Sequence, residues 1–580
     1  MRRGLVLLVA LISACASTQV TQETATHFQA QRHPVYGNAG MVTARERVAA
    51  EVGAKILADG GNAVDAAVAV GFSLAVTLPQ AGNIGGGGFM LVYDAASGDT
   101  IAIDYREKAP LAATRDMFLD DEGNADPEFS RYSHRASGVP GTVAGLYLAH
   151  QKLGRLSWKE LVEPAVKLAR DGIVVSHDFA GSLRSRRQRM CRDDATCSYF
   201  YKAGGEPYEF GDRLVQADLA DTLQLIADNG PDAFYRGSIA DKIVAEMEAG
   251  GGLIDKAALA AYSPVVRKPL RGNYRGYDIV TMPPPSSGGV HVIQMLNVLE
   301  HFPVAQLGVG SADGVHLLAE TMRLAFADRS KHLGDPEFYE VPVDWLTSDE
   351  YAAQLASGID LDKVRPSSDV LPGVAPPLES PDTTHFSIMD ADGNVVSNTY
   401  TLNLSFGSGI SVSGAGFLLN NEMDDFVSKP GVPNAFGLLG GKANEVESGK
   451  RPLSSMTPTI VFADGEPWFT AGSPGGSYII TAVLQMLVNV IDHGMNIADA
   501  VNQPRMHHQW YPDELRLESG YSPDTIRLLQ EKGHSMQSST SAMGSVQSVA
   551  WKDGVYRGAS DPRRPDGGSV APAASGAASK

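Results

Sequence analysis

An abrupt change of pattern near residue 382 constrains the fold of this chain more than any other feature. Residues 367–381 are rich in proline and show no regular hydrophobic period. Residues 384–390 and 395–400 then have the pattern of β-strands, and the segment between them, with its Asp and Gly residues, indicates a tight turn. The sequence therefore predicts a β-hairpin directly after an irregular segment. A threonine at such a boundary, here Thr383, is most often only a good strand former.

Further elements on both sides of this hairpin predict a layered α+β fold. Residues 41–76 have a helical pattern, and the part that follows Asn62 is so apolar that it predicts a buried helix with Asn62 as its N-cap. Residues 478–491 predict another strongly apolar helix. Further strands are predicted at residues 89–94, 100–105, 457–463 and 468–471. This order of helices and strands is compatible with a fold in which sheets lie between layers of helices. The hydrophobic pattern alone does not specify that architecture.

The composition is that of an ordinary globular protein. Of the 580 residues, 43% are hydrophobic and 20% are charged, so the chain has enough apolar residues for a large core. The formal net charge is −19, and no basic cluster is longer than residues 184–189. These values argue against a nucleic-acid partner.

The first residues have the features of a secretory signal. Arg2 and Arg3 precede an apolar run, residues 5–12, that is too short to span a membrane as a helix. We therefore expect the chain to be exported.

The end of this signal is similar to a bacterial lipobox. In residues 12–15 (ISAC), Cys15 would become the lipidated first residue of the mature chain. Removal of an ordinary signal at the Ala-x-Ala site of residues 14–16 is the alternative. We expect residues 1–15 to be the signal, residues 16–32 to be a flexible tether, and the protein to be a membrane-anchored periplasmic lipoprotein.

Two further cysteines, Cys191 and Cys197, flank a short polar segment. In an exported chain this arrangement predicts a disulfide that acts as a local staple. A redox-active pair is the alternative, although the spacing is not C-x-x-C.

Five motifs carry a resemblance to a known family. They occupy residues 381–387, 399–403, 420–426, 451–456 and 472–477. Together they resemble the small-subunit signature of the γ-glutamyltransferases, which belong to the N-terminal-nucleophile hydrolases. Members of that family are made as one inactive chain that cuts itself. The resemblance extends over nearly all of the chain from Pro34 to Arg563.

The resemblance implies both the fold and the subunit boundaries. The fold would be a four-layer αββα sandwich, formed jointly by two segments of one precursor. The cut would fall between Asp382 and Thr383, so that residues 33–382 form the large subunit and residues 383–564 form the small one. Residues 565–580 have low complexity, and we expect a disordered tail there.

The same resemblance assigns the catalytic groups. After the cut, Thr383 would carry a hydroxyl nucleophile and a free α-amine, whose ordinary pKa of about 7.7–8.0 suits a base. Thr401 would hydrogen-bond to that hydroxyl, and the backbone N–H groups of Gly475 and Gly476 would form an oxyanion hole. No metal or cofactor is implied, and the sequence has neither an H-E-x-x-H nor a G-x-S-x-G motif.

The resemblance also implies a site for both charges of an α-amino acid. An arginine and two serine hydroxyls would bind the α-carboxylate, and an aspartate with two polar neighbours would bind the α-ammonium group. In this order, the residues are Arg106, Ser454, Ser455, Asp425, Glu422 and Asn403. We expect Asp424 to point away from the site, because successive side chains of an extended segment face opposite sides.

Residues 429–441 correspond to a loop that covers the site in many bacterial relatives. Phe436 stands where those relatives often have a tyrosine, so a hydroxyl that would help to close the loop is missing. We expect a looser lid, more access for water and a preference for hydrolysis. Two other stretches that match the family, residues 85–88 and 325–329, are assigned to the scaffold.

Three functions are compatible with these motifs. The first is transfer of a γ-glutamyl group from glutathione or a similar donor to water, an amino acid or a peptide. The second is an acylase for glutaryl-type amides such as cephalosporin side chains, but a substrate without an ammonium group would leave Asp425 buried and unpaired. The third is a non-catalytic surface lipoprotein, which the presence of both threonines and both glycines disfavours.

Overall fold

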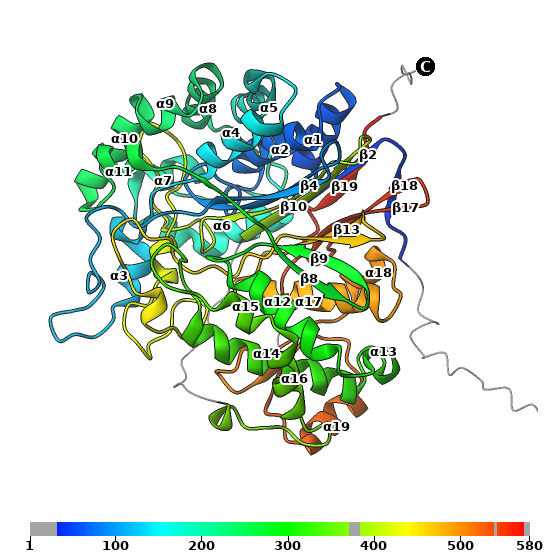
Figure 1. Ribbon diagram of the computed structural model, residues 1–580. Coiled ribbons are helices and arrows are strands. Elements are labelled where there is room, and N and C mark those ends of the chain that lie inside the picture. Colours follow the sequence, from blue (N-terminus) through cyan, green and yellow to red (C-terminus); the bar gives the residue numbers. More distant parts are fainter. Residues whose placement is uncertain (1–31, 371–382, 539–541, 574–580) are drawn as a thin grey trace, which may run out of the picture. The chain divides into compact units, whose positions relative to one another are not determined.

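Two seven-stranded antiparallel sheets lie face to face in the computed structural model, which describes residues 32–370, 383–538 and 542–573 (Figure 1). In spatial order, the first sheet contains β19 (Gly568–Val570), β2 (Gly40–Ala44), β10 (Thr383–Asp390), β11 (Val395–Thr401), β3 (Gly87–Asp94), β4 (Asp99–Tyr105) and β7 (Val265–Arg267). The second contains β1 (Val35–Gly37), β18 (Val555–Ser560), β17 (Gln547–Lys552), β13 (Glu466–Ala471), β12 (Thr459–Ala463), β9 (Tyr277–Thr281) and β8 (Leu270–Tyr274). Apolar side chains of both sheets, among them Phe89, Met389 and Ile460, share one core.

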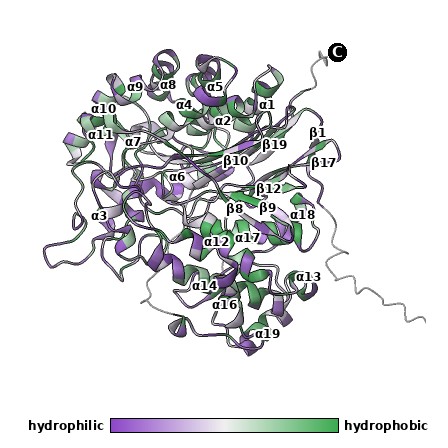
Figure 2. Ribbon diagram, in the orientation of Figure 1, coloured by the Kyte–Doolittle hydropathy of each residue, from purple (hydrophilic) through white to green (hydrophobic). Residues whose placement is uncertain are grey.

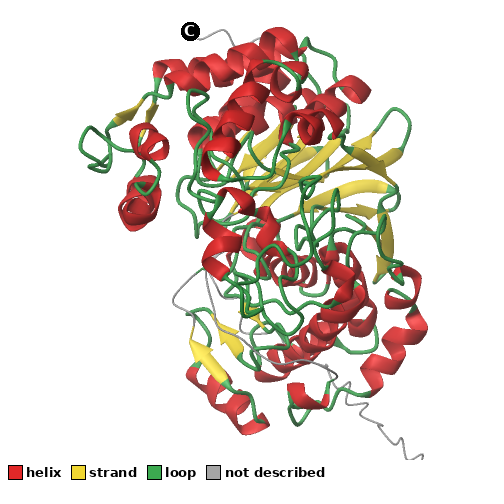
Figure 3. Ribbon diagram, turned by 90° about the vertical axis from the view of Figure 1, so that its left-hand side faces the viewer, coloured by secondary structure: helices red, strands yellow, loops and turns green. Residues whose placement is uncertain are grey.

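Helices cover the outer face of each sheet, so the fold has four layers (Figure 3). The first sheet shares its outer core with α1 (Arg47–Ala58), α2 (Ala63–Thr77), α4 (Thr142–Leu153), α5 (Trp158–Asp171) and α8 (Ala217–Asn229). The second shares its outer core with α12 (Ser287–Leu299), α14 (Ala312–His332), α17 (Tyr478–Ile491) and α18 (Ile497–Asn502). The α+β, four-layer αββα prediction is confirmed.

Further helices and strands complete the fold. The remaining α-helices are α3 (Pro127–Tyr132), α6 (His177–Met190), α7 (Asp194–Phe200), α9 (Asp232–Tyr235), α10 (Ser238–Gly250), α11 (Lys256–Ala261), α13 (Val304–Leu307), α15 (Val343–Leu346), α16 (Asp349–Ser357) and α19 (Pro523–Lys532). Strands β5 (Ile173–Val174) and β6 (Arg213–Leu214) form one small sheet, and β14 (Met506–His507), β15 (Leu515–Leu517) and β16 (Met536–Ser538) form another.

The two most apolar helices form for the reasons that the sequence indicates. The Asn62 side chain accepts hydrogen bonds from the N–H groups of Val64 and Asp65, and the Asp65 carboxylate accepts from the Asn62 N–H, which is a complete capping box. Every residue of α2 is buried, and so are nearly all residues of α17. The apolar character of α17 and its neighbour α12 is visible in Figure 2. Helices α2 and α17 can be apolar on all sides because each lies between a sheet and other segments of the protein.

Two predictions about secondary structure are wrong. Residues 41–44 were expected to be helical, but they belong to β2, whose backbone pairs with β10 on one side and β19 on the other. The expected disordered tail from residue 565 is ordered as far as residue 573, because β19 adds a strand to the edge of β2. The Arg47 N–H also donates to the Asp566 carbonyl oxygen, which anchors this segment before β19.

The predicted disulfide between Cys191 and Cys197 is confirmed, and it links the end of α6 to α7. The predicted signal, tether and Cys15 lie outside the described residues, and so does Asp382. Within the described ranges, none of the helices has both the length and the apolar character that crossing a membrane requires.

Candidate active site

The β10–β11 hairpin brings Thr383 and Thr401 together. The two residues are direct cross-strand partners, and their Oγ1 atoms are 3.2 Å apart, within hydrogen-bonding distance. Both residues are buried. Thr401 Oγ1 also accepts a hydrogen bond of 2.8 Å from the Asn403 N–H, and Arg45 Nη1 donates to the Thr383 carbonyl oxygen at 2.7 Å. The hydroxyl predicted to be the nucleophile is therefore held in a fixed environment at the first residue of an inner strand.

Gly475 and Gly476 lie just before α17, and Gly476 lines the same cavity as Thr383. Their φ angles are +135° and +54°, a region that glycine adopts without strain. Within residues 32–370, 383–538 and 542–573, neither of their N–H groups donates a hydrogen bond. Free N–H groups at the start of a helix favour negative charge, so this turn has the chemistry of an oxyanion hole.

The same cavity contains every residue predicted to bind substrate. It is lined by Arg106, Arg329, Thr383, Thr401, Asn403, Glu422, Asp425, Phe436, Leu438, Ser454, Ser455, Met456, Gly476 and Ile479. These residues come from segments separated by more than three hundred positions. The structure thus brings the predicted site residues together, with Gly475 next to the lining.

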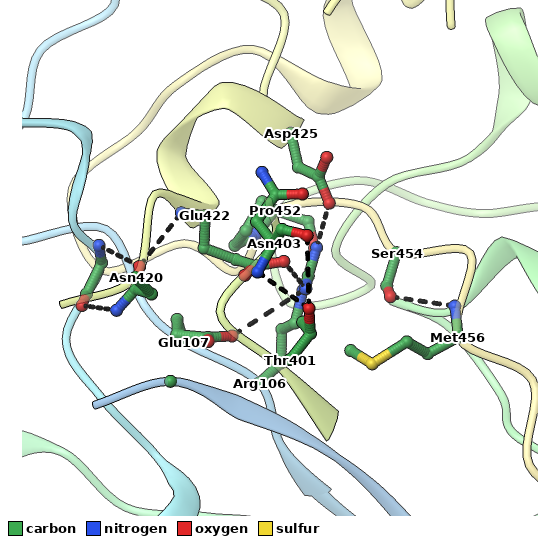
Figure 4. A network of polar contacts seen from close by, with 12 residues as sticks. Arg106, Glu107, Thr401, Asn403, Asn420, Glu422, Asp425, Pro452, Ser454 and Met456 are labelled. Atoms are coloured by element: carbon green, nitrogen blue, oxygen red, sulfur yellow. Dashed lines mark hydrogen bonds and ion pairs between the residues drawn. The ribbon is translucent and has the colours of Figure 1, made fainter. Parts of the chain in front are cut away.

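Arg106, at the end of β4, is the centre of a buried ion cluster (Figure 4). Its Nη1 pairs with Glu422 Oε1, and its Nη2 lies 2.5 Å from Asp425 Oδ2. Glu107 is a further buried acid, 3.9 Å from Arg106 Nη1. The guanidinium also donates to the carbonyl oxygens of the segment that precedes Ser454. Groups predicted to bind opposite charges of the substrate are therefore paired with each other.

Carboxyl groups outnumber guanidinium groups in this cluster. The buried Glu107 and Glu422 and the largely buried Asp425 surround one guanidinium, and burial raises the pKa of each of them, to about 8 for Glu107. Neither carboxyl oxygen of Glu107 has a hydrogen-bond partner among the described residues. An ammonium group brought into the cavity would favour the ionised form of these acids, and a carboxylate would replace an acid on Arg106. The cluster is complementary to a zwitterionic α-amino acid group.

The remaining predicted residues frame this cluster. Ser454 Oγ accepts from the Met456 N–H at 3.1 Å, and Ser455 Oγ accepts from Arg329 Nη2 at 3.3 Å. Asn403 has a φ of +78° and donates from Nδ2 to a backbone carbonyl, which fixes its side chain. All three residues are buried and line the cavity.

Arg329 is a site residue that the sequence prediction assigned to the scaffold. It lies near the C-terminal end of α14, lines the cavity, and donates to Ser287 Oγ at 2.9 Å as well as to Ser455. Burial lowers the pKa of Arg329 to about 10. Within the described residues it has no carboxylate within 4 Å, so it is a second cation available to a bound anion. The charged pair 328–329 after the apolar run 325–327 could have indicated it, but the sequence prediction made no use of this signal.

Asp424 stays out of the cluster, as expected, but not for the expected reason. Residues Glu422–Asp425 form a 3₁₀ helix and not an extended segment. The Asp424 side chain points toward Ser130 and Ala435, and it accepts hydrogen bonds of 2.5 Å from Ser130 Oγ and 2.7 Å from the Ala435 N–H. It therefore supports the loop over the site without contacting Arg106.

The loop of residues 429–441 lies against the site. Phe436 is buried and lines the cavity, and its carbonyl oxygen accepts from Gln509 Nε2 at 3.2 Å. Asn434 Nδ2 donates to Asp425 Oδ1 at 3.2 Å. These contacts hold the loop without a tyrosine hydroxyl. The looser lid expected from Phe436 stays a prediction.

The histidines near the site are poor candidates for a base. His385 lies between Thr399 Oγ1 and Ser387 Oγ, and burial lowers its pKa to about 3. His507 is likewise buried, with a pKa near 3, and is bonded to Thr481 and Gln509. Both imidazoles are neutral and engaged at neutral pH.

The glycines at 85–88 have the structural role that was predicted for them. A Cβ on Gly86 would stand 2.0 Å from the Thr401 carbonyl oxygen, and one on Gly87 would stand 2.8 Å from Glu107 Oε2. Because glycine has no Cβ, the backbone at these positions can approach Thr401 and Glu107 this closely.

A buried threonine at the first residue of an inner strand, in a four-layer αββα sandwich, defines the class of N-terminal-nucleophile hydrolases. The family model described as Gamma-glutamyltranspeptidase matches residues 49–571. The chain is 55% identical over 535 residues to the glutathione hydrolase proenzyme of Escherichia coli strain K12, and the match covers 92% of each chain. The chain belongs to the gamma-glutamyltranspeptidase family.

Solved structures agree with this assignment. A cephalosporin acylase from Bacillus halodurans superposes with a TM-score of 0.83 at 28% identity, and the match covers 94% of this chain and 98% of that one. The Helicobacter pylori gamma-glutamyltranspeptidase superposes with a TM-score of 0.55 at 48% identity, over 56% of this chain and 93% of that one.

Proposed function

We propose that this protein is a self-cleaving γ-glutamyltransferase and glutathione hydrolase that uses Thr383 as its nucleophile. One observation carries the proposal: a single cavity joins the Thr383 hydroxyl to the buried cluster of Arg106, Glu422 and Asp425. A γ-glutamyl group has an α-amino acid at one end and an acyl carbon at the other. The side chains that line the cavity are chemically complementary to both ends.

The first reaction is the cut of the precursor. Thr383 Oγ attacks the carbonyl carbon of Asp382, the peptide bond to the Thr383 nitrogen breaks, and that nitrogen becomes the free α-amine. Water then hydrolyses the resulting ester, so that Asp382 ends in a carboxylate and the hydroxyl is regenerated. Thr401, with its Oγ1 3.2 Å from that of Thr383, orients the attacking hydroxyl.

Binding of a donor reorganises the ion cluster. The α-carboxylate of the donor takes a place on Arg106, together with the Ser454 and Ser455 hydroxyls. The α-ammonium group then takes the place of Arg106 beside Asp425 and Glu422. Each of these protein charges thereby exchanges its present partner for an opposite charge of the donor. Arg329 contributes a second positive charge on the carboxylate side.

The acyl transfer uses the groups that the cut has released. The Thr383 α-amine, directly or through water, takes the hydroxyl proton, and Oγ attacks the γ-carbonyl of the donor. The Gly475 and Gly476 N–H groups stabilise the oxyanion, and the donor's amine leaves with the proton. Water, an amino acid or a peptide then attacks the acyl-enzyme and regenerates Thr383.

A glutaryl-type acylase is the second candidate, because the Bacillus halodurans structure bears the name cephalosporin acylase. A glutaryl group lacks the ammonium group, so it would leave Asp425 and Glu422 without a new partner when a carboxylate occupies Arg106. Burying unpaired carboxylates is costly. The cluster therefore favours γ-glutamyl donors.

Two chromogenic anilides that differ only in the α-amino group test this choice. We expect the purified protein to hydrolyse the γ-glutamyl anilide at least about 100-fold more efficiently, by kcat/KM, than the glutaryl anilide, because a lost charge pair in a buried site costs about 3 kcal/mol or more. Equal or reversed efficiencies would support the acylase. No turnover of either anilide by a correctly cut protein would point to a binding protein.

We also propose that the chain is exported and anchored through a lipid on Cys15. The basic and apolar start of the chain and the lipobox-like residues 12–15 support this proposal, and a disulfide between Cys191 and Cys197 is typical of an oxidising compartment. Mass spectrometry of membrane-associated protein is expected to find a lipidated Cys15 as the first residue. An unmodified N-terminus at Ser17 would contradict the anchor and leave export standing.

A further inference from the structure

A second cluster of polar side chains lies outside the active site, between α14 and the segment that follows α19. His316 and Glu320 are one turn apart on α14, and His534 lies two residues after the last residue of α19. One nitrogen of each imidazole and one carboxylate oxygen of Glu320 all lie within 4.8 Å of one another. All three side chains are buried, so solvent does not explain their grouping. The two helices lie beside each other in Figure 1.

The hydrogen bonds of His316 determine which of its nitrogens carries the proton. His316 Nε2 lies 2.8 Å from the Asp360 carbonyl oxygen, which can only accept. Nε2 therefore carries the proton, and Nδ1 of the neutral ring does not. Nδ1 lies 2.8 Å from His534 Nε2. An imidazole held through its other N–H by a backbone carbonyl is the usual arrangement of a metal-binding histidine.

The hydrogen bonds describe a neutral His316 ring, with its proton on Nε2 and with Nδ1 accepting from His534 Nε2. Metal ions bind this neutral form of histidine.

Glu320 supplies the third group. Its Oε1 has no hydrogen-bond partner among the described residues, although Arg323 Nη2 is an ion-pair partner at 3.2 Å. Its Oε2 accepts a long bond of 3.3 Å from the Arg365 N–H. Arg323 is also bonded to Ser367 and Asp513, so it stays paired if a cation takes part of the Glu320 carboxylate.

We propose that His316, Glu320 and His534 form a binding site for a divalent first-row transition cation, with Zn²⁺ as the best match. Two imidazoles and one carboxylate are a ligand set that Zn²⁺ prefers, and a water would complete four-fold coordination. Tetrahedral geometry with Zn–N bonds of about 2.0–2.1 Å requires the two nitrogens to move apart to roughly 3.3 Å. The proton of His534 Nε2 moves to its Nδ1, and the cation takes the position between the rings.

The position of this site indicates a structural role. His316 and Arg329 are both on α14, thirteen residues apart, which corresponds to about 20 Å along the helix axis. A cation at His316 is thus too far away to take part in chemistry at Thr383. It would instead tie α14 to the segment after α19 and stabilise the folded state by mass action.

The test uses untagged, full-length protein that has been stripped with a chelator and dialysed. Calorimetric titration with Zn²⁺ alone is expected to give one equivalent per chain and a higher thermal midpoint. Co²⁺ is expected to give the intense visible absorption of a four-coordinate ion. His316→Gln and His534→Gln keep a polar side chain but remove an imidazole, and each should weaken binding by more than the ~10- to 100-fold typical of losing an outer-shell partner.

His301→Gln, at an exposed histidine, is the matched control and should bind Zn²⁺ like the wild type. The thermal midpoints without metal show whether each variant is folded, and Glu320→Gln provides a third variant if a histidine variant is not. Wild-type protein that binds less than one equivalent would overturn the proposal. So would a folded His316→Gln or His534→Gln variant with unchanged affinity.

Discussion

Thr383→Ala is expected to remain one uncut chain without turnover. The same hydroxyl performs the cut and the acyl transfer in the proposed mechanism, so its removal abolishes both. Neither His385 nor His507 can take over, because both are neutral, buried and already hydrogen-bonded. A denaturing gel and a γ-glutamyl anilide assay measure the two effects on the same preparation.

Two further variants separate the roles of the hydroxyl and its surroundings. Thr383→Ser keeps the hydroxyl but loses the methyl group that restricts χ1, so we expect a slow cut and slow turnover. Thr401→Ala removes the partner 3.2 Å from the nucleophile and should delay the cut. A Thr383→Ala chain that is cut at the normal rate would show that another group is the nucleophile.

Asp425→Asn is expected to lower kcat/KM for γ-glutamyl donors roughly 30- to 1,000-fold. This factor corresponds to a loss of about 2–4 kcal/mol in transition-state stabilisation. The variant removes the carboxylate that would bind the donor's ammonium group, while its amide preserves the size of the side chain. The loss should be specific to that group, so turnover of the glutaryl anilide should not fall in parallel.

Asp424→Asn is the matched control for this experiment. Asp424 is a neighbouring buried acid, but it contacts Ser130 and the Ala435 N–H and not Arg106. We expect less than about a tenfold effect from it. Asparagine keeps an acceptor for Ser130 Oγ, and although it loses the bond from the Ala435 N–H and the charge that faces Arg131, none of these residues lines the cavity. Near-normal efficiency of Asp425→Asn would mean that the substrate's ammonium group binds elsewhere.

Much of the fold was predictable because local signals and tertiary packing agree. The hairpin of β10 and β11, the N-cap at Asn62 and the full length of α17 follow from hydrophobic period and capping chemistry. The predicted substrate residues also meet in one cavity, and all of them except Arg106 belong to the motifs that carry the family resemblance.

The failures occur where a distant partner decides the outcome. Residues 41–44 form a strand because β10 and β19 supply hydrogen bonds, and the last described residues are ordered because β2 offers an unpaired edge. Arg329 reaches the site only because α14 packs beside the segment that contains Ser455. The pairing of His316 with His534 spans more than two hundred residues, and no local pattern indicates it.

The N-terminal sequence and intact mass of the purified wild-type subunits test the central claim most directly. The mechanism predicts two segments, of which the smaller begins at Thr383 with a free amine and ends at the C-terminus of the chain. A fully active protein that remains a single chain, or one whose cut leaves Thr383 inside a segment, would contradict it.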